Sequence, residues 1–267
     1  MNRTILAGTL WLVVVGLWPA ASWAERPRIA IVIDDMGYQT GNDFAILGLD
    51  HQVAVAVIPE APGAAAVSAK ANRQGREVLI HLPLEGLVHD NCQPALTCIG
   101  MDWSVERIHH HLDAALERVS GAVGINNHQG SRFTRNADAV ARLVAGIERV
   151  GRNRGQPLFV LDSRTVVDTV FERTALDAGL PALRRRVFLD HQHDPVKIRM
   201  AWEDLLDLAR YHGSALAIGH PREHTIEFLT RILPTLADEN IELVPPSELS
   251  RIQPAVADRH HSTTDLP

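Results

Sequence analysis

The chain has 267 residues, of which 46% are hydrophobic and 22% are charged, and its formal net charge is −6 at pH 7. This composition supplies enough apolar side chains for the core of one large domain or two small ones. It excludes a strongly basic chain, so nucleic acid is not an expected partner.

The first residues have the three regions of a secretory signal peptide. Arg3 gives a basic start, residues 6–17 form an apolar stretch, and Ser22-Trp23-Ala24 offers small residues for cleavage. The apolar stretch is shorter than the roughly 20 residues of a comfortable membrane span. We therefore predict a signal peptide over residues 1–24, a periplasmic location and no stable membrane span after cleavage. An uncleaved segment that anchors the protein in the inner membrane is the alternative.

Short apolar runs recur along the rest of the chain and predict strands. They cover residues 29–33, 53–58, 78–82, 122–125, 158–161, 187–189, 215–218 and 241–244. Segments with helical spacing lie between most of them, at residues 61–74, 105–119, 136–149, 168–178, 195–211 and 223–238. This alternation predicts an α/β fold with a parallel sheet, and about eight such units fit a closed or nearly closed β/α barrel. An open, doubly wound sheet is the alternative.

The end of the chain, which includes His260 and His261, is polar and has no hydrophobic period. We predict one domain over residues 25–250, followed by a disordered tail over residues 251–267.

Cys92 and Cys98 are the two cysteines of the chain. In an exported protein, a closely spaced pair predicts a disulfide across a small surface loop. A metal site with two cysteine ligands is the weaker alternative, because the spacing is not C-x-x-C and no second pair exists.

Most of the predicted strands are followed by residues whose side chains could act in catalysis or bind a metal ion. Asp34 and Asp35 follow the first strand, His81 and Glu85 the third, His128 the fourth, Asp162 and Arg164 the fifth, Asp190 and His191 the sixth, and His220 the seventh. The carboxyl ends of parallel strands meet at one edge, where α/β enzymes place their active sites. This one-sided distribution predicts an active site.

One carboxylate and two imidazoles are a common catalytic ligand set, which leaves positions open for water and substrate. Asp35, His81 and His128 are the best candidates for that set. Asp34 is the candidate base, and a cation would relieve the repulsion between the two adjacent aspartates. His220 is the candidate acid for a leaving group. An Asp that caps the next helix is the alternative for the acidic pair.

Two arginines are candidates for orienting or electrostatic roles. Arg132 or Arg164 could orient Asp162 or neutralise a developing oxyanion. Asp162 and Asp190 could instead be helix caps.

Other histidines and aromatic residues have simpler interpretations. The run from His109 to His111 lies in an amphipathic helix and is expected to be a solvated face, with a metal site as the less favoured alternative. His191 and His193 are either part of a polar rim or a secondary contact for metal or substrate. Trp103 and Trp202 are the obvious rings for stacking against sugars.

Five segments, taken in order, resemble the divergent polysaccharide deacetylase family of the NodB-homology superfamily. They are Ile33-Asp34-Asp35-Met36-Gly37, Ile80-His81-Leu82-Pro83-Leu84-Glu85, Asn127-His128-Gln129-Gly130-Ser131, Leu161-Asp162-Ser163-Arg164-Thr165 and Ile218-Gly219-His220-Pro221. The resemblance runs from about Arg28 to Leu249. It implies a distorted barrel of seven or eight strands and a divalent metal ion, usually zinc. It also implies Asp34 as the base, His220 as the acid, and Asp35, His81 and His128 as ligands.

The chain differs from mainstream deacetylases, which place both ligand histidines after one strand in an H-x-x-x-H pattern. Here the second ligand must come from another strand, as the divergent branch suggests. The resemblance implies an exported hydrolase that acts on an acetylated polysaccharide or a peptidoglycan-type glycan. The alternative is a catalytically inactive periplasmic protein on the same fold, which either binds glycans or is an accessory protein of the cell envelope. A phosphate-binding enzyme is not favoured, because the chain lacks a Gly-rich phosphate loop.

Overall fold

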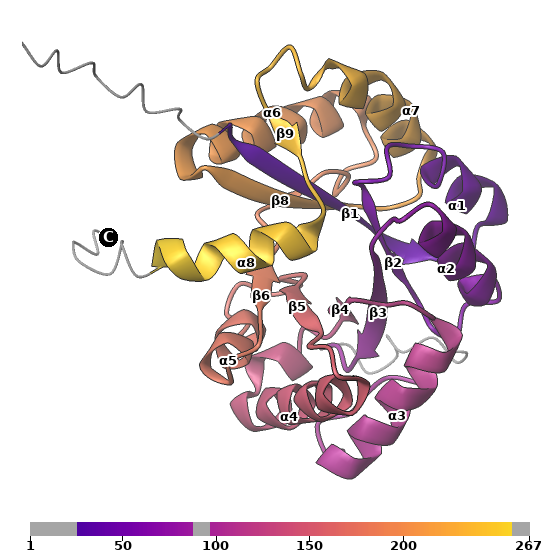
Figure 1. Ribbon diagram of the computed structural model, residues 1–267, viewed down its shortest axis with the longest axis vertical. Helices are drawn as coiled ribbons and strands as arrows, with labels where there is room; N and C mark the ends of the chain where they lie inside the picture. Colours follow the sequence, from indigo (N-terminus) through magenta and orange to yellow (C-terminus); the bar gives the residue numbers. More distant parts are fainter. Residues whose placement is uncertain (1–25, 88–96, 258–267) are drawn as a thin grey trace, which may run out of the picture.

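The computed structural model describes residues 26–87 and 97–257. The strands in these residues form one curled parallel sheet (Figure 1). In sheet order the strands are β6 (Ala182–Arg184), β5 (Phe159–Asp162), β4 (Gly124–Gln129), β3 (Val78–Leu84), β2 (Ala54–Val57), β1 (Arg28–Met36), β8 (Ser214–Gly219) and β7 (Val187–Phe188). β9 (Glu242–Leu243) pairs with β1. Strands β1 to β6 follow one another around the sheet in chain order, so the order does not reverse at β1 as it does in a doubly wound sheet. The predicted α/β fold with a distorted barrel is confirmed.

A single chain segment joins the two edges of this sheet. Only Arg185 and Arg186 separate β6 from β7. The Arg185 amide donates to the Asp162 carbonyl of β5, and the Arg186 amide donates to the Leu216 carbonyl of β8, each over 2.9 Å. The sheet therefore curls until its edge strands are neighbours in the chain.

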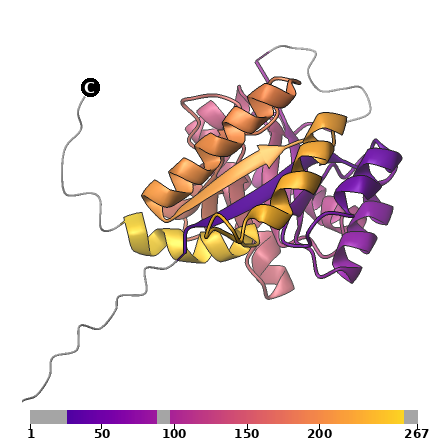
Figure 2. The same ribbon diagram turned by 90° about the horizontal axis from the view of Figure 1, so that it is seen from above.

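The helices surround the curled sheet (Figures 1 and 2). They are α1 (Thr40–Ile46), α2 (Ala64–Arg73), α3 (Val105–Arg118), α4 (Ala137–Arg154), α5 (Phe171–Asp177), α6 (Pro195–His212), α7 (Glu223–Ile232) and α8 (Pro246–Ala257), with short 3-10 turns at Phe133–Arg135 and Leu233–Thr235. α6 begins where Asp194 accepts hydrogen bonds from the Val196 and Lys197 amides, with Pro195 in the first turn. The sequence pattern did not predict α1 or α8.

Side chains alternate along the strands, and this alternation builds two apolar layers. Ile29, Ile31 and Ile33 of β1 belong to the larger cluster, which the sheet forms with the helices. Ala30 and Val32 belong to the smaller cluster of inward-facing residues, which fills the barrel. The barrel interior is thus packed with small and medium apolar side chains below its carboxyl end.

Several predictions fall at the borders of the described residues. α8 extends to Ala257, so residues 251–257 are helical where the sequence predicted the start of a disordered tail. Residues 1–24 and Cys92 lie outside the described residues, so the signal peptide and the disulfide between Cys92 and Cys98 stay predictions. None of the helices in residues 26–87 and 97–257 combines the length and apolarity that crossing a bilayer requires.

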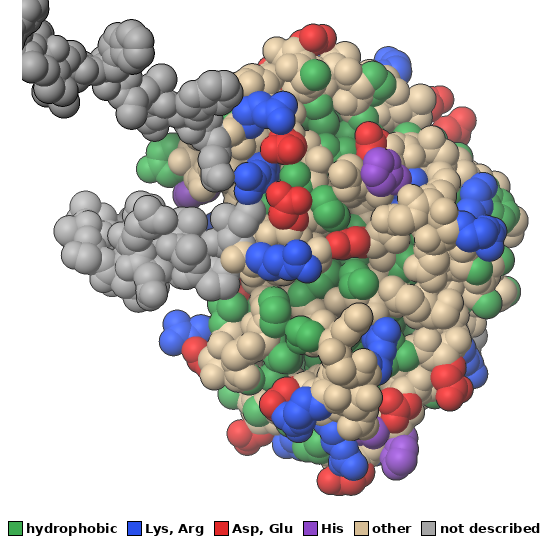
Figure 3. All heavy atoms as spheres, viewed as in Figure 1, with side chains coloured by type: hydrophobic (Ala, Val, Ile, Leu, Met, Phe, Trp, Pro, Cys, Tyr) green, Lys and Arg blue, Asp and Glu red, His purple; other side chains and the backbone are tan. Residues whose placement is uncertain are grey.

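Charges of both signs are intermixed on the face viewed in Figure 3. Among the ion pairs of the described residues, Arg28 lies 3.7 Å from Glu242 and 3.9 Å from Glu248. A mixed surface of this kind does not attract a polyanion along this face.

The turn after β4 generates a prediction about stability. Gly130 has a φ of +83°, and an added Cβ would lie 2.9 Å from Leu84 Cβ; Gly155 has a φ of +67° and no atom within 4 Å of an added Cβ. Alanine at either position costs about 1 kcal/mol of backbone strain, and the contact with Leu84 adds roughly 1–3 kcal/mol. We expect urea denaturation to show a larger loss for Gly130→Ala than for Gly155→Ala. Equal losses would show that Leu84 moves aside at no cost.

Candidate metal centre

The inward-facing positions of several strands change from apolar to polar at the carboxyl end of the barrel. β1 presents Ala30 and Val32 and then Asp34, β3 presents Leu79 and then His81, and β8 presents Leu216 and Ile218 before His220. Because alternate residues share a face, the same periodicity that fills the barrel also brings these polar groups together above the core.

A bulge in β1 lets two consecutive aspartates face one site. Asp34 and Asp35 together lie opposite the single residue Ala56 of β2, and Asp35 has a left-handed φ of +57°. In a regular strand the two carboxylates would point to opposite faces of the sheet. Here Asp34 Oδ2 lies 3.7 Å from His81 Nδ1, and Asp35 Oδ1 lies 3.1 Å from His81 Nε2.

The three predicted ligands come together in the structure. Asp35 Oδ1 lies 2.9 Å from His128 Nδ1, and His81 Nε2 lies 3.1 Å from His128 Nδ1. Ligand atoms that share one ion through bonds of about 2.0–2.2 Å are separated by roughly 2.9–3.5 Å. Among the described residues, Asp35 Oδ1 is buried without a hydrogen-bond partner. The donor set, its spacing and this unpaired oxygen fit a divalent metal ion.

The electrostatics of the cluster favour a positive charge at this point. Burial lowers the pKa of His81, but the charge of Asp34 and the close contact with Asp35 outweigh burial and raise that pKa to about 9. Burial raises the pKa of Asp35, but His128 and His81 bring it well below its usual range. Either a proton or a divalent cation can supply the charge that the two carboxylates attract.

The proposed base has a different environment from its neighbour. Burial raises the pKa of the Asp34 carboxyl, against the lowering effect of His81 and His220. The Asp35 side chain is 37% exposed, whereas the Asp34 side chain is 4% exposed. The cluster is therefore open to solvent beside Asp35 and closed beneath Asp34.

His220 faces the cluster and is oriented by a residue whose role the sequence left open. Its Nε2 lies 3.7 Å from Asp35 Oδ2, and its Nδ1 lies 2.8 Å from Asp190 Oδ1. Asp190 is fully buried, and its Oδ2 accepts hydrogen bonds from the His220 amide and the Thr225 hydroxyl. Asp190 is therefore a partner of His220 and not a helix cap. Its place after β7, next to β8, is the signal that could have indicated this contact.

The predicted orienting residues have hydrogen-bond and ion-pair partners other than the three candidate ligands. Arg132 Nη1 lies 2.8 Å from Glu85 Oε1. Asp162 accepts hydrogen bonds from the Arg164 amide, the Glu172 amide and the Thr169 hydroxyl. Arg164 thus contacts Asp162 through its backbone, and Asp162 holds the connection to α5, whose N-cap residue is Val170.

The other histidines and tryptophans differ in part from expectation. His109 is 7% exposed, and it contacts Asp113 (Nδ1 to Oδ2, 3.3 Å) and Asn153 (Nε2 to Nδ2, 3.2 Å), so it does not lie on a solvated face. Trp103 and Trp202 are buried in the core, where Trp103 packs against the ring of His111 and Trp202 against the ring of Phe228. Neither tryptophan can present its ring to a sugar in this structure.

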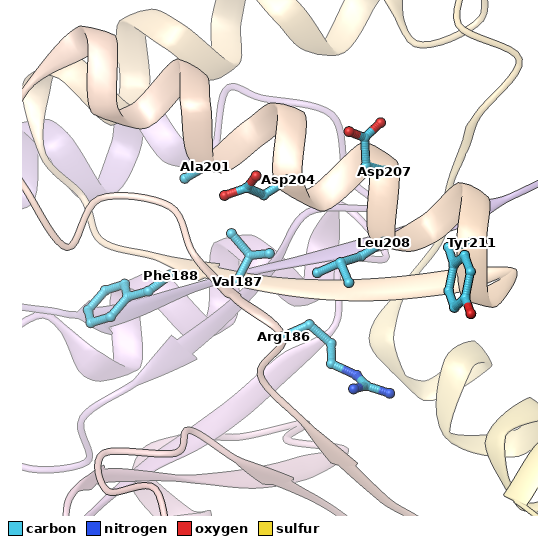
Figure 4. A pocket seen from close by; sticks show the side chains of 8 residues that line it. All are labelled: Arg186, Val187, Phe188, Ala201, Asp204, Asp207, Leu208 and Tyr211. Carbon is cyan, nitrogen blue, oxygen red and sulfur yellow. The ribbon is translucent and has the colours of Figure 1, made fainter. Parts of the chain in front are cut away.

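A groove of about 580 Å³ lies between β7 and α6 (Figure 4). Phe188 lies at one end, and its ring is 5.3 Å from the ring of His220. Arg186 lines the groove from the chain beside β7, and Asp204 and Tyr211 line it from α6. Phe188 thus lines the groove and also contacts His220.

The chain matches the divergent polysaccharide deacetylase family over residues 31–250, and it belongs to that family. It is 36% identical over 222 residues to a protein of Escherichia coli (strain K12) described as uncharacterized protein YibQ, a match that covers 83% of this chain and 67% of the other.

Three solved structures extend the comparison to the fold. The uncharacterized protein ATU2773 of Agrobacterium tumefaciens C58 has a TM-score of 0.75 at 21% identity, covering 85% of this chain and 91% of that one. BA3943 of Bacillus anthracis, a CE4 family pseudoenzyme, has a TM-score of 0.50 at 11% identity, covering 84% of this chain and 66% of that one. A BA3943 mutant with restored enzymatic activity has the same TM-score.

The described residues contain two groups that could hold a metal ion, and this generates a prediction. One is Asp35, His81 and His128; the other is His109, His110 and Asp113 on α3. We expect mass spectrometry of protein loaded with zinc, without a histidine tag, to find about one ion per chain. His128→Ala should lose this ion, because it removes one of three convergent ligands, and His109→Ala should keep it. Full occupancy in His128→Ala, or a loss in His109→Ala, would move the site to α3.

Proposed function

We propose that the protein is an exported, metal-dependent deacetylase that removes acetyl groups from a polysaccharide or a peptidoglycan-type glycan in the periplasm, with zinc as its metal ion. The single observation that carries the proposal is the convergence of Asp35, His81 and His128 within 3.1 Å, beside Asp34 and His220. Membership of the divergent polysaccharide deacetylase family supports the reaction class.

The three ligands would hold a divalent ion, which supplies Lewis acidity that polarises an acyl carbonyl and makes water a better nucleophile. Asp34 accepts the proton of the attacking water, and its raised pKa brings it closer to the range of a working base. His220 donates a proton from Nε2 to the departing amine or alcohol, so acetate and the deacetylated sugar are released. Asp190 holds Nδ1 of His220, which directs Nε2 toward the site.

The neighbourhood of His220 supports a glycan as the substrate. Phe188 borders both His220 and the groove along α6, and its ring also lies 4.8 Å from the Arg185 guanidinium. Sugars stack on apolar ring faces and accept hydrogen bonds from polar neighbours. We propose that the groove receives the part of the glycan that extends from the acetylated sugar.

A protein on this fold that binds without turnover is the second candidate, because one solved structure of the same fold belongs to a pseudoenzyme. The residues of this chain favour the enzyme. The proposed base Asp34, the proposed acid His220 with its partner Asp190, and the three candidate ligands lie close together, and this supports turnover.

Asp34→Asn tests the assignment of the base. The amide cannot accept a proton, so acetate release from acetylated chitooligosaccharides or peptidoglycan fragments should fall about 10²–10⁴-fold while zinc content is unchanged. Asp43→Asn is the matched control, since Asp43 is a buried aspartate that holds the Gly37 and Gln39 amides. It should stay near the wild-type rate. Normal turnover in Asp34→Asn would remove Asp34 from the mechanism, and a wild type that binds zinc but releases no acetate would favour the binding protein.

A further inference from the structure

Asn126 joins the proposed base to one of the proposed ligands. It is fully buried, and it lies on β4 directly opposite His81 on β3. Its Nδ2 donates to Asp34 Oδ1 over 2.7 Å, and its Oδ1 lies 2.9 Å from His81 Nδ1. A longer contact of 3.3 Å joins Nδ2 to Ser163 Oγ. One amide therefore contacts both groups.

The chemistry of the two partners fixes the direction of this amide. An ionised carboxylate only accepts hydrogen bonds, so Asp34 requires the NH₂ end of Asn126. The carbonyl end then faces His81 Nδ1, which must carry the ring proton. An imidazole that ligates a metal ion is neutral and has one N–H, so in that form Nε2 of His81 keeps its lone pair toward Asp35 and His128. The other tautomer would place a proton on Nε2, which could not ligate a metal ion.

We propose that Asn126 is a positioning residue with two separable roles. It fixes His81 in the tautomer and orientation that ligate the metal ion, and it holds the Asp34 carboxylate for proton transfer from water. The inference rests on the proposed function, since both roles serve metal-dependent hydrolysis. Partners of this kind are worth about 10–100-fold in metal affinity or activity.

Only an amide can serve both partners at once. Aspartate at position 126 would still accept from His81 Nδ1, as carboxylates do for many metal-bound histidines. It would offer no donor to Asp34 and would repel its charge. Alanine would remove both contacts. The two substitutions therefore separate the role toward the metal ion from the role toward the base.

The test compares Asn126→Ala and Asn126→Asp with Asn127→Ala. Asn127 is a buried neighbour on β4 whose side chain contacts the Gln129 carbonyl and the Ser163 amide, and it contacts neither Asp34 nor His81. Zinc affinity is measured by competition with a chromogenic chelator. The His81 tautomer is read from long-range ¹H–¹⁵N spectra of the zinc-loaded protein, and turnover is read from acetate release at saturating zinc.

We expect Asn126→Ala to lose about 10–100-fold in zinc affinity and to show a mixture of His81 tautomers. Asn126→Asp should match or exceed the wild-type affinity and keep the proton on Nδ1, yet lose turnover even when saturated with zinc. Asn127→Ala should keep both the affinity and the tautomer. A purely structural role would not produce this split.

Several outcomes would overturn the inference. Wild-type zinc affinity in Asn126→Ala, or equal losses in Asn126→Ala and Asn127→Ala, would remove the role toward His81. Full turnover in Asn126→Asp would remove the role toward Asp34. If Asn126→Asp does not fold, Asn126→Ala and the spectra still decide the first role. A wild type that binds no zinc would overturn the proposed function itself. Failure of the proposed function and failure of the role of Asn126 therefore give different results.

Discussion

The bulge at Asp34 and Asp35 is the constraint on which the site depends. A regular β1 would turn one of these carboxylates inward and the other toward the helices. The extra residue and the left-handed backbone of Asp35 bring both carboxylates to His81, one at each ring nitrogen. Adjacent carboxylates repel each other. The buried His81 imidazole between them reduces this repulsion, because it either holds a proton or binds a divalent cation.

The register between β3 and β4 builds the rest of the cluster. His81 lies opposite Asn126, and alternation along β4 then returns His128 to the same inward face. The strand between β1 and β3 contributes Ala54 and Ala56 to the barrel interior. These methyl side chains leave the space across which Asp34 and Asp35 reach His81.

Much of the fold could be predicted from the sequence, because recurring short apolar runs and helical periods determine where strands and helices form. β6 was missed because Ala182–Arg184 is too short to show a period, and α1 because Thr40–Ile46 is short and polar. The predicted ligands could be named from strand ends alone. The roles of Asn126 and Asp190 could not be assigned in that way, because each acts through a residue on another strand and depends on how those strands pair.

The spread of the proposed ligands over three strands would also couple metal binding to folding. In an H-x-x-x-H arrangement both histidines lie in one local segment, so part of the site can persist when the sheet loosens. Here Asp35, His81 and His128 meet only when β1, β3 and β4 are in register. An ion bound only by the folded state stabilises that state by mass action. The divergent ligand pattern thus makes the site more dependent on the whole barrel, and it gives the barrel a link between segments far apart in the chain.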